Sequence, residues 1–150
     1  MRMFVAALLT VVLSPFPALM AEDKKEDTDR FQGTWVVVKL EQTGEDLAEF
    51  VKEFSPTMAF DGKKYTFTVG EVVEKGEFKL DPKAKMPTID YDIQEGEQKG
   101  KKQVGIYKFD GDTLILSLAQ EGAEVRPTKF QTAADAPEFV MFTLKRKKKD

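Results

Sequence analysis

Two carboxylates on one predicted strand, Asp90 and Asp92, have the residue type and spacing most suited to chemistry. Apolar residues alternate with them over residues 88–94, the pattern of a half-buried strand, so both acids belong to its polar face. Side chains two positions apart on a strand lie about 7 Å apart, where a carboxylate pair can exchange protons or contribute to a calcium site. No ordered loop of acidic ligands accompanies the pair, so we favour a solvated strand face.

Composition excludes several other chemistries. The 150 residues contain no His and no Cys, so Ser-His-Asp sites, Cys-His sites and His- or thiolate-ligated zinc sites are impossible. Neither Ser55 nor Ser117 lies in a Gly-x-Ser-x-Gly elbow, and the scattered glycines form no phosphate-binding loop. We therefore predict no catalytic residue, no metal site and no cofactor.

The charge distribution argues against nucleic acid as a partner. The formal net charge is −3, and no element combines basic with aromatic residues in the manner of a nucleic-acid interface. Residues 22–29 are mainly acidic, whereas residues 145–149 are all basic. We expect the basic run to be a solvated tail, and contact with an anionic envelope surface is the alternative.

The first 21 residues have the features of a secretory signal. A basic start at Arg2 precedes an apolar run over residues 4–13, which is too short to span a bilayer. Pro15 and Pro17 follow, and the sequence becomes highly charged directly after Ala21. We predict cleavage after Ala21 and export to the periplasm or the extracellular space, with no transmembrane segment in the mature chain. An uncleaved N-terminal anchor is the alternative.

Beyond this signal, the sequence predicts one β-rich domain over residues 29–146. A charged leader over 22–28 precedes it, and a basic tail over 147–150 follows it. We expect a short helical turn at 29–32, a first strand at 35–40 and a short amphipathic helix or lid at 45–54.

Two Asp-Gly pairs, at 61–62 and 110–111, lie between alternating runs, which is the strongest short-range hairpin signal. Two-residue turns at these pairs place Tyr107 opposite Leu114 and Met58 opposite Tyr65. Each hairpin then has one aromatic face that suits a barrel interior.

Further strands are expected at 72–80, 88–94 and 138–146, and a brief one at 128–131 within the long connection 120–137. About eight strands with hardly any crossover helix favour an all-β, antiparallel fold, a barrel or a sandwich. Trp35 is the only tryptophan. We expect its ring to be buried at one end, beneath the guanidinium of Arg146 or Arg126, which would hold the first strand to the last.

The segment Gly33-Thr34-Trp35 after a short helical turn resembles the start of a lipocalin (calycin) domain. The chain also resembles an uncharacterised lipocalin-like domain family abundant in planctomycete genomes, over nearly all of residues 31–146. The matching stretches are Phe31-Gln32-Gly33-Thr34-Trp35, Lys79-Leu80-Asp81-Pro82, Pro87-Thr88-Ile89-Asp90, Gly105-Ile106-Tyr107, Asp110-Gly111-Asp112-Thr113-Leu114 and Arg126-Pro127-Thr128-Lys129-Phe130. The resemblance implies an up-and-down barrel but no established activity. Ser117 stands where that family often has a cysteine.

These observations leave three functional hypotheses. The first is an exported, non-catalytic barrel that holds a small apolar or aromatic ligand, in a cavity lined by Tyr65, Phe67, Tyr91, Tyr107 and Arg126. The second is a cell-envelope module that binds another protein and has a filled barrel. A carboxylate-dependent enzyme is the least favoured. The free volume inside the barrel distinguishes the first two.

Overall fold

The computed structural model describes residues 26–148. The predicted signal peptide, most of the expected leader and the last two residues lie outside this range. The helices are α1 (Asp27–Phe31) and α2 (Ala48–Phe54), and the strands are β1 (Gly33–Gln42), β2 (Glu45–Asp46), β3 (Thr57–Asp61), β4 (Lys64–Val69), β5 (Val72–Asp81), β6 (Thr88–Glu95), β7 (Lys102–Asp110), β8 (Thr113–Ala119) and β9 (Phe139–Arg146).

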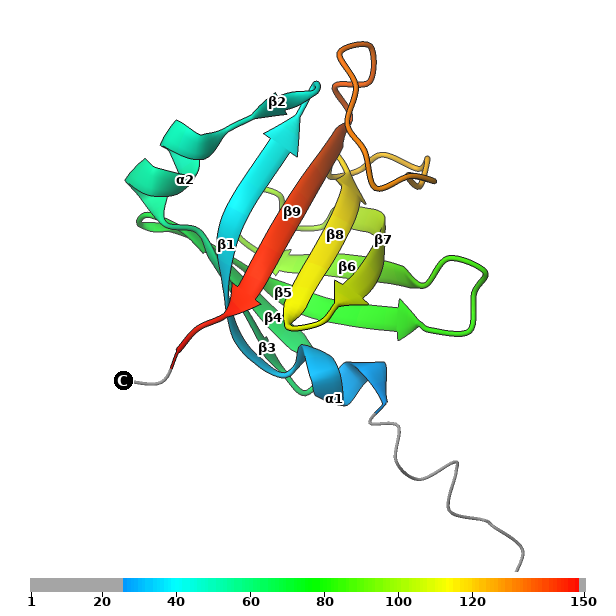
Figure 1. Ribbon diagram of the computed structural model, residues 1–150. Coiled ribbons are helices and arrows are strands. Elements are labelled where there is room, and N and C mark those ends of the chain that lie inside the picture. Colours follow the sequence, from blue (N-terminus) through cyan, green and yellow to red (C-terminus); the bar gives the residue numbers. More distant parts are fainter. Residues whose placement is uncertain (1–25, 149–150) are drawn as a thin grey trace, which may run out of the picture.

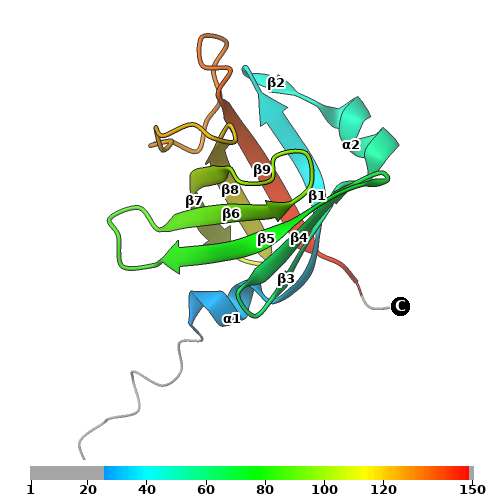
Figure 2. The same cartoon turned by 180° about the vertical axis from the view of Figure 1, so that it is seen from behind.

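The strands form an antiparallel up-and-down barrel (Figures 1 and 2). Strands β3 to β9 pair in chain order, β1 pairs with β3, and the β1–β9 pairing closes the barrel. The additional strand β2 extends only two residues beside the end of β1. The all-β barrel class, the helical turn before the first strand and the helix after it are therefore as the sequence predicted.

The two short helices differ from their predicted bounds. Helix α1 begins at Asp27 and so includes the end of the expected leader; acidic residues in a first turn favour a helix N-terminus. Helix α2 begins only at Ala48, because residues 45 and 46 pair with β1. Figure 1 shows α1 beneath one end of the barrel and α2 beside β1.

Both predicted hairpins form, but their turns lie one residue further along the chain. The central residues are Gly62-Lys63 and Gly111-Asp112, and Tyr107 pairs with Leu116. Within each turn only the glycine has a positive φ, 62° and 57°, as in turns with glycine at the first central position. The pairing shifts by two residues, so every side chain keeps its predicted face.

The connection between β8 and β9 contains no strand over the described residues 120–138, so the brief strand predicted at 128–131 is wrong. The strands that flank this connection, β8 and β9, are each already paired on both sides and offer it no free edge. The connection is instead held by side chains: Pro127 is buried, and Arg126 bonds to backbone carbonyls of β6 and β7.

Aromatic side chains fill the barrel at the end where α1 lies, here called the closed end. Phe31 of α1 is fully buried, and its ring centroid lies 5.0 Å from the rings of both Phe60 and Tyr107. The indole Nε1 of Trp35 donates a hydrogen bond of 2.7 Å to the carbonyl of Phe31. Helix α1 is thus a plug that buries one aromatic ring and satisfies the polar atom of another.

The first and last strands are joined at the closed end by Trp35 and Arg146. These residues are cross-strand partners, and the guanidinium carbon of Arg146 lies 4.4 Å from the centroid of the buried indole. Arg146 also donates to the carbonyl oxygens of Gln32 and Arg30. A Cβ at Gly33 would lie 3.2 Å from Nη1 of Arg146, so glycine leaves room for this arrangement. It matches the stacking predicted for Trp35 and Arg146.

Candidate functional site

A small cavity of about 30 Å³ lies inside the barrel, toward the end opposite α1, here called the mouth. The mouth is formed by the β4–β5 turn, the β6–β7 turn and the start of the 120–138 connection. The cavity is lined by Met58, Tyr65, Phe67, Glu74, Tyr91, Gln103, Leu118, Glu121 and Phe142. A volume of this size holds one or two water molecules. The interior is therefore mostly filled by side chains.

Glu74 brings a carboxylate into the barrel because it shares the inner face of β5 with Gly76 and Phe78. Its cross-strand partner is Phe67, and the Tyr65 hydroxyl donates a hydrogen bond of 3.1 Å to Oε2 of Glu74. A Cβ at Gly76 would lie 2.0 Å from the carbonyl oxygen of Asp92. Glycine at position 76 therefore allows β5 to approach β6 closely beside this site.

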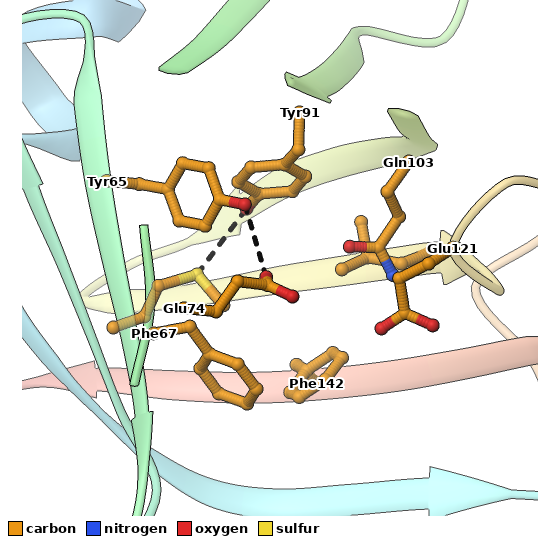
Figure 3. A pocket seen from close by; sticks show the side chains of 9 residues that line it. Tyr65, Phe67, Glu74, Tyr91, Gln103, Glu121 and Phe142 are labelled. Atoms are coloured by element: carbon orange, nitrogen blue, oxygen red, sulfur yellow. Dashed lines mark hydrogen bonds between the residues drawn. The ribbon is translucent and has the colours of Figure 1, made fainter. Parts of the chain in front are cut away.

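Tyr91 supplies the deepest polar atom of the cavity. The residue is 2% exposed, and its hydroxyl donates to the Met58 sulfur at 3.4 Å. The rings of Tyr65 and Tyr91 pack edge to face, with their centroids 4.6 Å apart. Figure 3 shows the Tyr65 hydroxyl, the Tyr91 hydroxyl and the Glu74 carboxylate converging on one region, with the rings of Phe67 and Phe142 beside them.

Burial and negative charge together shift the acidities of these groups. Burial raises the pKa of Glu74 above its ordinary value; the hydrogen bond from Tyr65 lowers it, and the nearby charge of Glu121 raises it further. Burial is also the main cause that raises the pKa of Tyr65, followed by the charge of Glu74. The pKa of Tyr91 rises through burial, Tyr65 and Glu74. All three pKa values are raised, so the neutral forms of these side chains are favoured in the cavity.

The carboxylates of the cavity are not neutralised by basic side chains. Among the nine lining residues two are acidic and none is Lys or Arg. Over residues 26–148 neither Glu74 nor Glu121 takes part in an ion pair. The site thus combines aromatic and apolar walls with hydrogen-bond acceptors that are acidic.

Three of the five residues predicted to line a ligand cavity do so: Tyr65, Phe67 and Tyr91. Tyr107 does not, and this prediction is corrected. Its ring packs against Phe31 at the closed end, and its hydroxyl donates a hydrogen bond of 2.7 Å to Oδ2 of Asp27. Helix α1 occupies the space that a ligand would need beside this tyrosine.

Arg126 also lies outside the cavity, so its predicted place at the ligand site is wrong. Its Nη1 atom donates to the Gly105 carbonyl at 2.8 Å and lies 2.7 Å from Oδ1 of Asp90. Asp90 belongs to the outer face of β6, because Ile89 and Tyr91 point inward. Arg126 therefore secures the long connection against the outside of the barrel.

The structure adds lining residues that the sequence analysis did not assign to the site, chiefly Glu74, Gln103, Glu121 and Phe142. The alternation of Glu74, Gly76 and Phe78 along β5 contains a signal for Glu74. Glu121 follows the end of β8 in an irregular connection, where no periodic pattern indicates the direction of a side chain.

Fold and site together define a plugged, up-and-down β-barrel with a small acidic and aromatic cavity near its mouth. Among the helices of residues 26–148, none has the length and apolar character required to cross a membrane. No family model and no curated protein matches this chain, so the planctomycete family resemblance stays a prediction.

Solved structures similar to this chain include the following two. A DUF4847 family protein from Bacteroides vulgatus shares 12% identity with a TM-score of 0.49, and the match covers 80% of this chain and 96% of that chain. A variant of the fluorescent protein UnaG shares 14% identity with a TM-score of 0.40, over 81% of this chain and 99% of that one. Neither similarity assigns a family or a ligand to this protein.

Proposed function

We propose that this protein is a non-catalytic binding barrel whose mouth cavity takes a small apolar or aromatic ligand. The observation that carries the proposal is the cavity lining, in which apolar and aromatic walls surround a few convergent polar groups. Ligand sites in proteins typically have this composition, and the mouths of barrels are common places for them. The closed end is unsuited because α1 and its aromatic neighbours fill it.

The small volume restricts how such a ligand binds. A cavity of about 30 Å³ admits only one end of a molecule unless a side chain moves. Phe67 is half-buried, and its ring touches that of Phe142 edge to face at 5.8 Å. Helix α2 buries none of its own residues. We propose that the ring of Phe67 moves when the ligand enters.

We further propose that the protein is exported and that residues 1–21 are removed. The basic start, the short apolar run and the charged sequence after Ala21 support this proposal. Intact-mass measurement on protein from native cells tests it, and a mass that retains Met1 contradicts it.

A matched pair of variants tests ligand binding. Phe67 and Phe109 are both partly buried and pack on the core, but only Phe67 lines the cavity. Thermal-shift and native-mass screens against fatty acids, fatty amines and phenyl or indole compounds should identify binders of the purified protein. Phe67→Ala should change the affinity of these compounds severalfold because it enlarges the cavity, whereas Phe109→Ala should leave their affinity unchanged.

Two outcomes contradict the binding proposal. One is that no compound in the screen binds. The other is that both alanine variants change affinity equally, which would place the ligand outside the mouth.

Exposed apolar side chains favour a second candidate, the envelope interaction module. The rings of Phe50 and Phe54 on α2 are 4.8 Å apart and each residue is 36% exposed. Phe54 lies against Gly70 of the β4–β5 turn, and Val72 and Val73 beyond this turn are also exposed. If no small molecule binds, photo-crosslinking from position 54 in native cells should give one defined partner, and the substitution Phe50→Ser should abolish that product.

A further inference from the structure

The mouth cavity contains hydrogen-bond acceptors that can accept more hydrogen bonds than they receive. The Tyr91 hydroxyl is wholly buried, and its only hydrogen-bond partner within residues 26–148 is the Met58 thioether, a weak acceptor. Its oxygen receives no hydrogen bond there. Glu74 receives one hydrogen bond, from Tyr65, although a carboxylate accepts several. A ligand that brings several N–H donors would satisfy these atoms.

The charge of the cavity lining also favours a ligand that brings N–H donors, in particular a cationic one. Glu74 and Glu121 are the charged residues of the cavity, and no basic side chain lines it. The charge of Glu121 raises the pKa of Glu74, so it increases the cost of holding a charged carboxylate at position 74. A positive charge near Glu74 would offset this repulsion and favour the ionised form of Glu74.

The aromatic rings of the cavity also suit a cation. Tyr65, Tyr91, Phe67 and Phe142 contribute four rings to the lining. Ring faces attract cations within about 6 Å, and aromatic cages bind ammonium ligands in this way. Hydrogen bonding, charge and aromatic lining are thus three features that fit one chemical group.

We propose that the cavity recognises a primary ammonium group, carried by a ligand whose apolar or aromatic body lies toward the mouth. This inference rests on the proposed ligand-binding function and specifies the class of ligand. A primary ammonium has three donors and about the size of a water molecule, and it fits a volume of about 30 Å³. A trimethylammonium group would require Phe67 or Phe142 to move.

Four probes with the same phenyl body test this proposal. They are 2-phenylethylamine, its N,N,N-trimethyl derivative, 2-phenylethanol and 3-phenylpropionate, each titrated into the purified protein at pH 7 by isothermal calorimetry. The amine should bind about tenfold more tightly than the alcohol, because hydrogen bonds to charged groups are the stronger ones. The trimethyl derivative should bind more weakly than the amine, and the propionate should bind weakest of the four.

The outcomes separate this inference from the function on which it rests. If the alcohol or the propionate binds as tightly as the amine, the cavity binds ligands but does not recognise ammonium. If the trimethyl derivative binds as tightly as the amine, recognition does not use N–H donors, and the proposal of a primary ammonium fails. If none of the four binds, and the wider screen is also negative, the binding function itself fails.

Variants that each remove one carboxylate charge test which residues recognise the ammonium group. Glu74→Gln keeps the shape of the side chain and should reduce amine affinity about tenfold, with a clearly smaller loss of 2-phenylethanol affinity, because only the amine carries a charge. Asp92→Asn removes an exposed carboxylate from the outer face of β6 and serves as the matched control. Glu121→Gln provides a second test should Glu74→Gln fold poorly. Equal losses of amine affinity in Asp92→Asn and the cavity variants would overturn the proposal, because they would indicate a general charge effect.

Discussion

At the scale of single residues, the most informative feature is the inversion at the start of β5. Val73 is exposed, whereas the carboxylate of Glu74 points into the barrel, the reverse of what burial of apolar surface favours. Sequence patterns agree with structure almost everywhere else in this strand. Local departures of this kind are expected where function, and not stability, determines the residue.

The raised pKa of Glu74 makes the stability of the protein depend on pH. The folded state holds the Glu74 proton more tightly than the unfolded state, so this group favours folding fully below the ordinary Glu pKa of 4.5. That contribution is lost as the pH rises through the folded-state pKa. Glu74→Gln removes this dependence because its amide does not titrate.

We therefore expect Glu74→Gln to gain stability relative to the parent protein as the pH rises from 4.5 to 8. Urea unfolding at several pH values measures this difference, with Asp92→Asn as the control that should show a smaller trend. A parallel pH dependence of the Glu74→Gln variant and the parent would contradict the burial of this carboxylate.

The same residue-scale reasoning explains which site residues could be predicted. Tyr65, Phe67 and Tyr91 follow from strand alternation, which assigned their inner face correctly. Tyr107 has the same inward direction, but alternation does not indicate how far along the barrel axis a residue lies or whether α1 covers it. Arg126 belongs to an irregular connection, where no alternation of residues predicts the direction of a side chain.

At the scale of elements, the closed end depends on α1 and on the first residues of β1. The indole of Trp35 touches the plug through its hydrogen bond to Phe31 and touches the last strand through Arg146. One side chain thus connects α1, β1 and β9. The contact between Trp35 and Arg146 was predicted from the sequence, whereas the hydrogen bond from Trp35 to α1 was not.

Replacing Trp35 by alanine should lower the free energy of unfolding by about 3–5 kcal/mol, since truncation of a buried tryptophan leaves a cavity. Chemical denaturation measures the change. Val38→Ala is the matched control on the same strand, because Val38 is 46% exposed and should cost about 0.5 kcal/mol or less. If both variants unfold at the same denaturant concentration, Trp35 does not hold the closed end.

At the boundaries of elements, tertiary contacts override the local sequence signals. The Asp-Gly pairs predicted both hairpins, but the barrel uses glycine as the first central residue of each turn. The shift of two residues preserved the faces because strand side chains alternate. The brief strand expected at 128–131 does not form, because the flanking strands β8 and β9 are each paired on both sides.

At the scale of the whole molecule, the barrel fold could be predicted from the sequence, but the free volume inside the barrel could not. Strand count and the scarcity of helices predict an antiparallel barrel, whereas the free space depends on how nine side chains from several strands pack together. That packing filled the closed end and left a cavity near the mouth. The interior is therefore mostly filled, and its remaining free volume of about 30 Å³ lies near the mouth.

The central claim is that ligands enter the mouth cavity and not another surface. Methyl-labelled protein saturated with 2-phenylethylamine, or with the tightest binder of the wider screen, allows nuclear Overhauser effects to locate the compound. Contacts are predicted to the methyl groups of Met58 and Leu118, which line the cavity, and not to those of Leu114, which is fully buried in the same barrel core but does not line the cavity. Contacts confined to Val72 and Val73, or to Leu114, would contradict the claim.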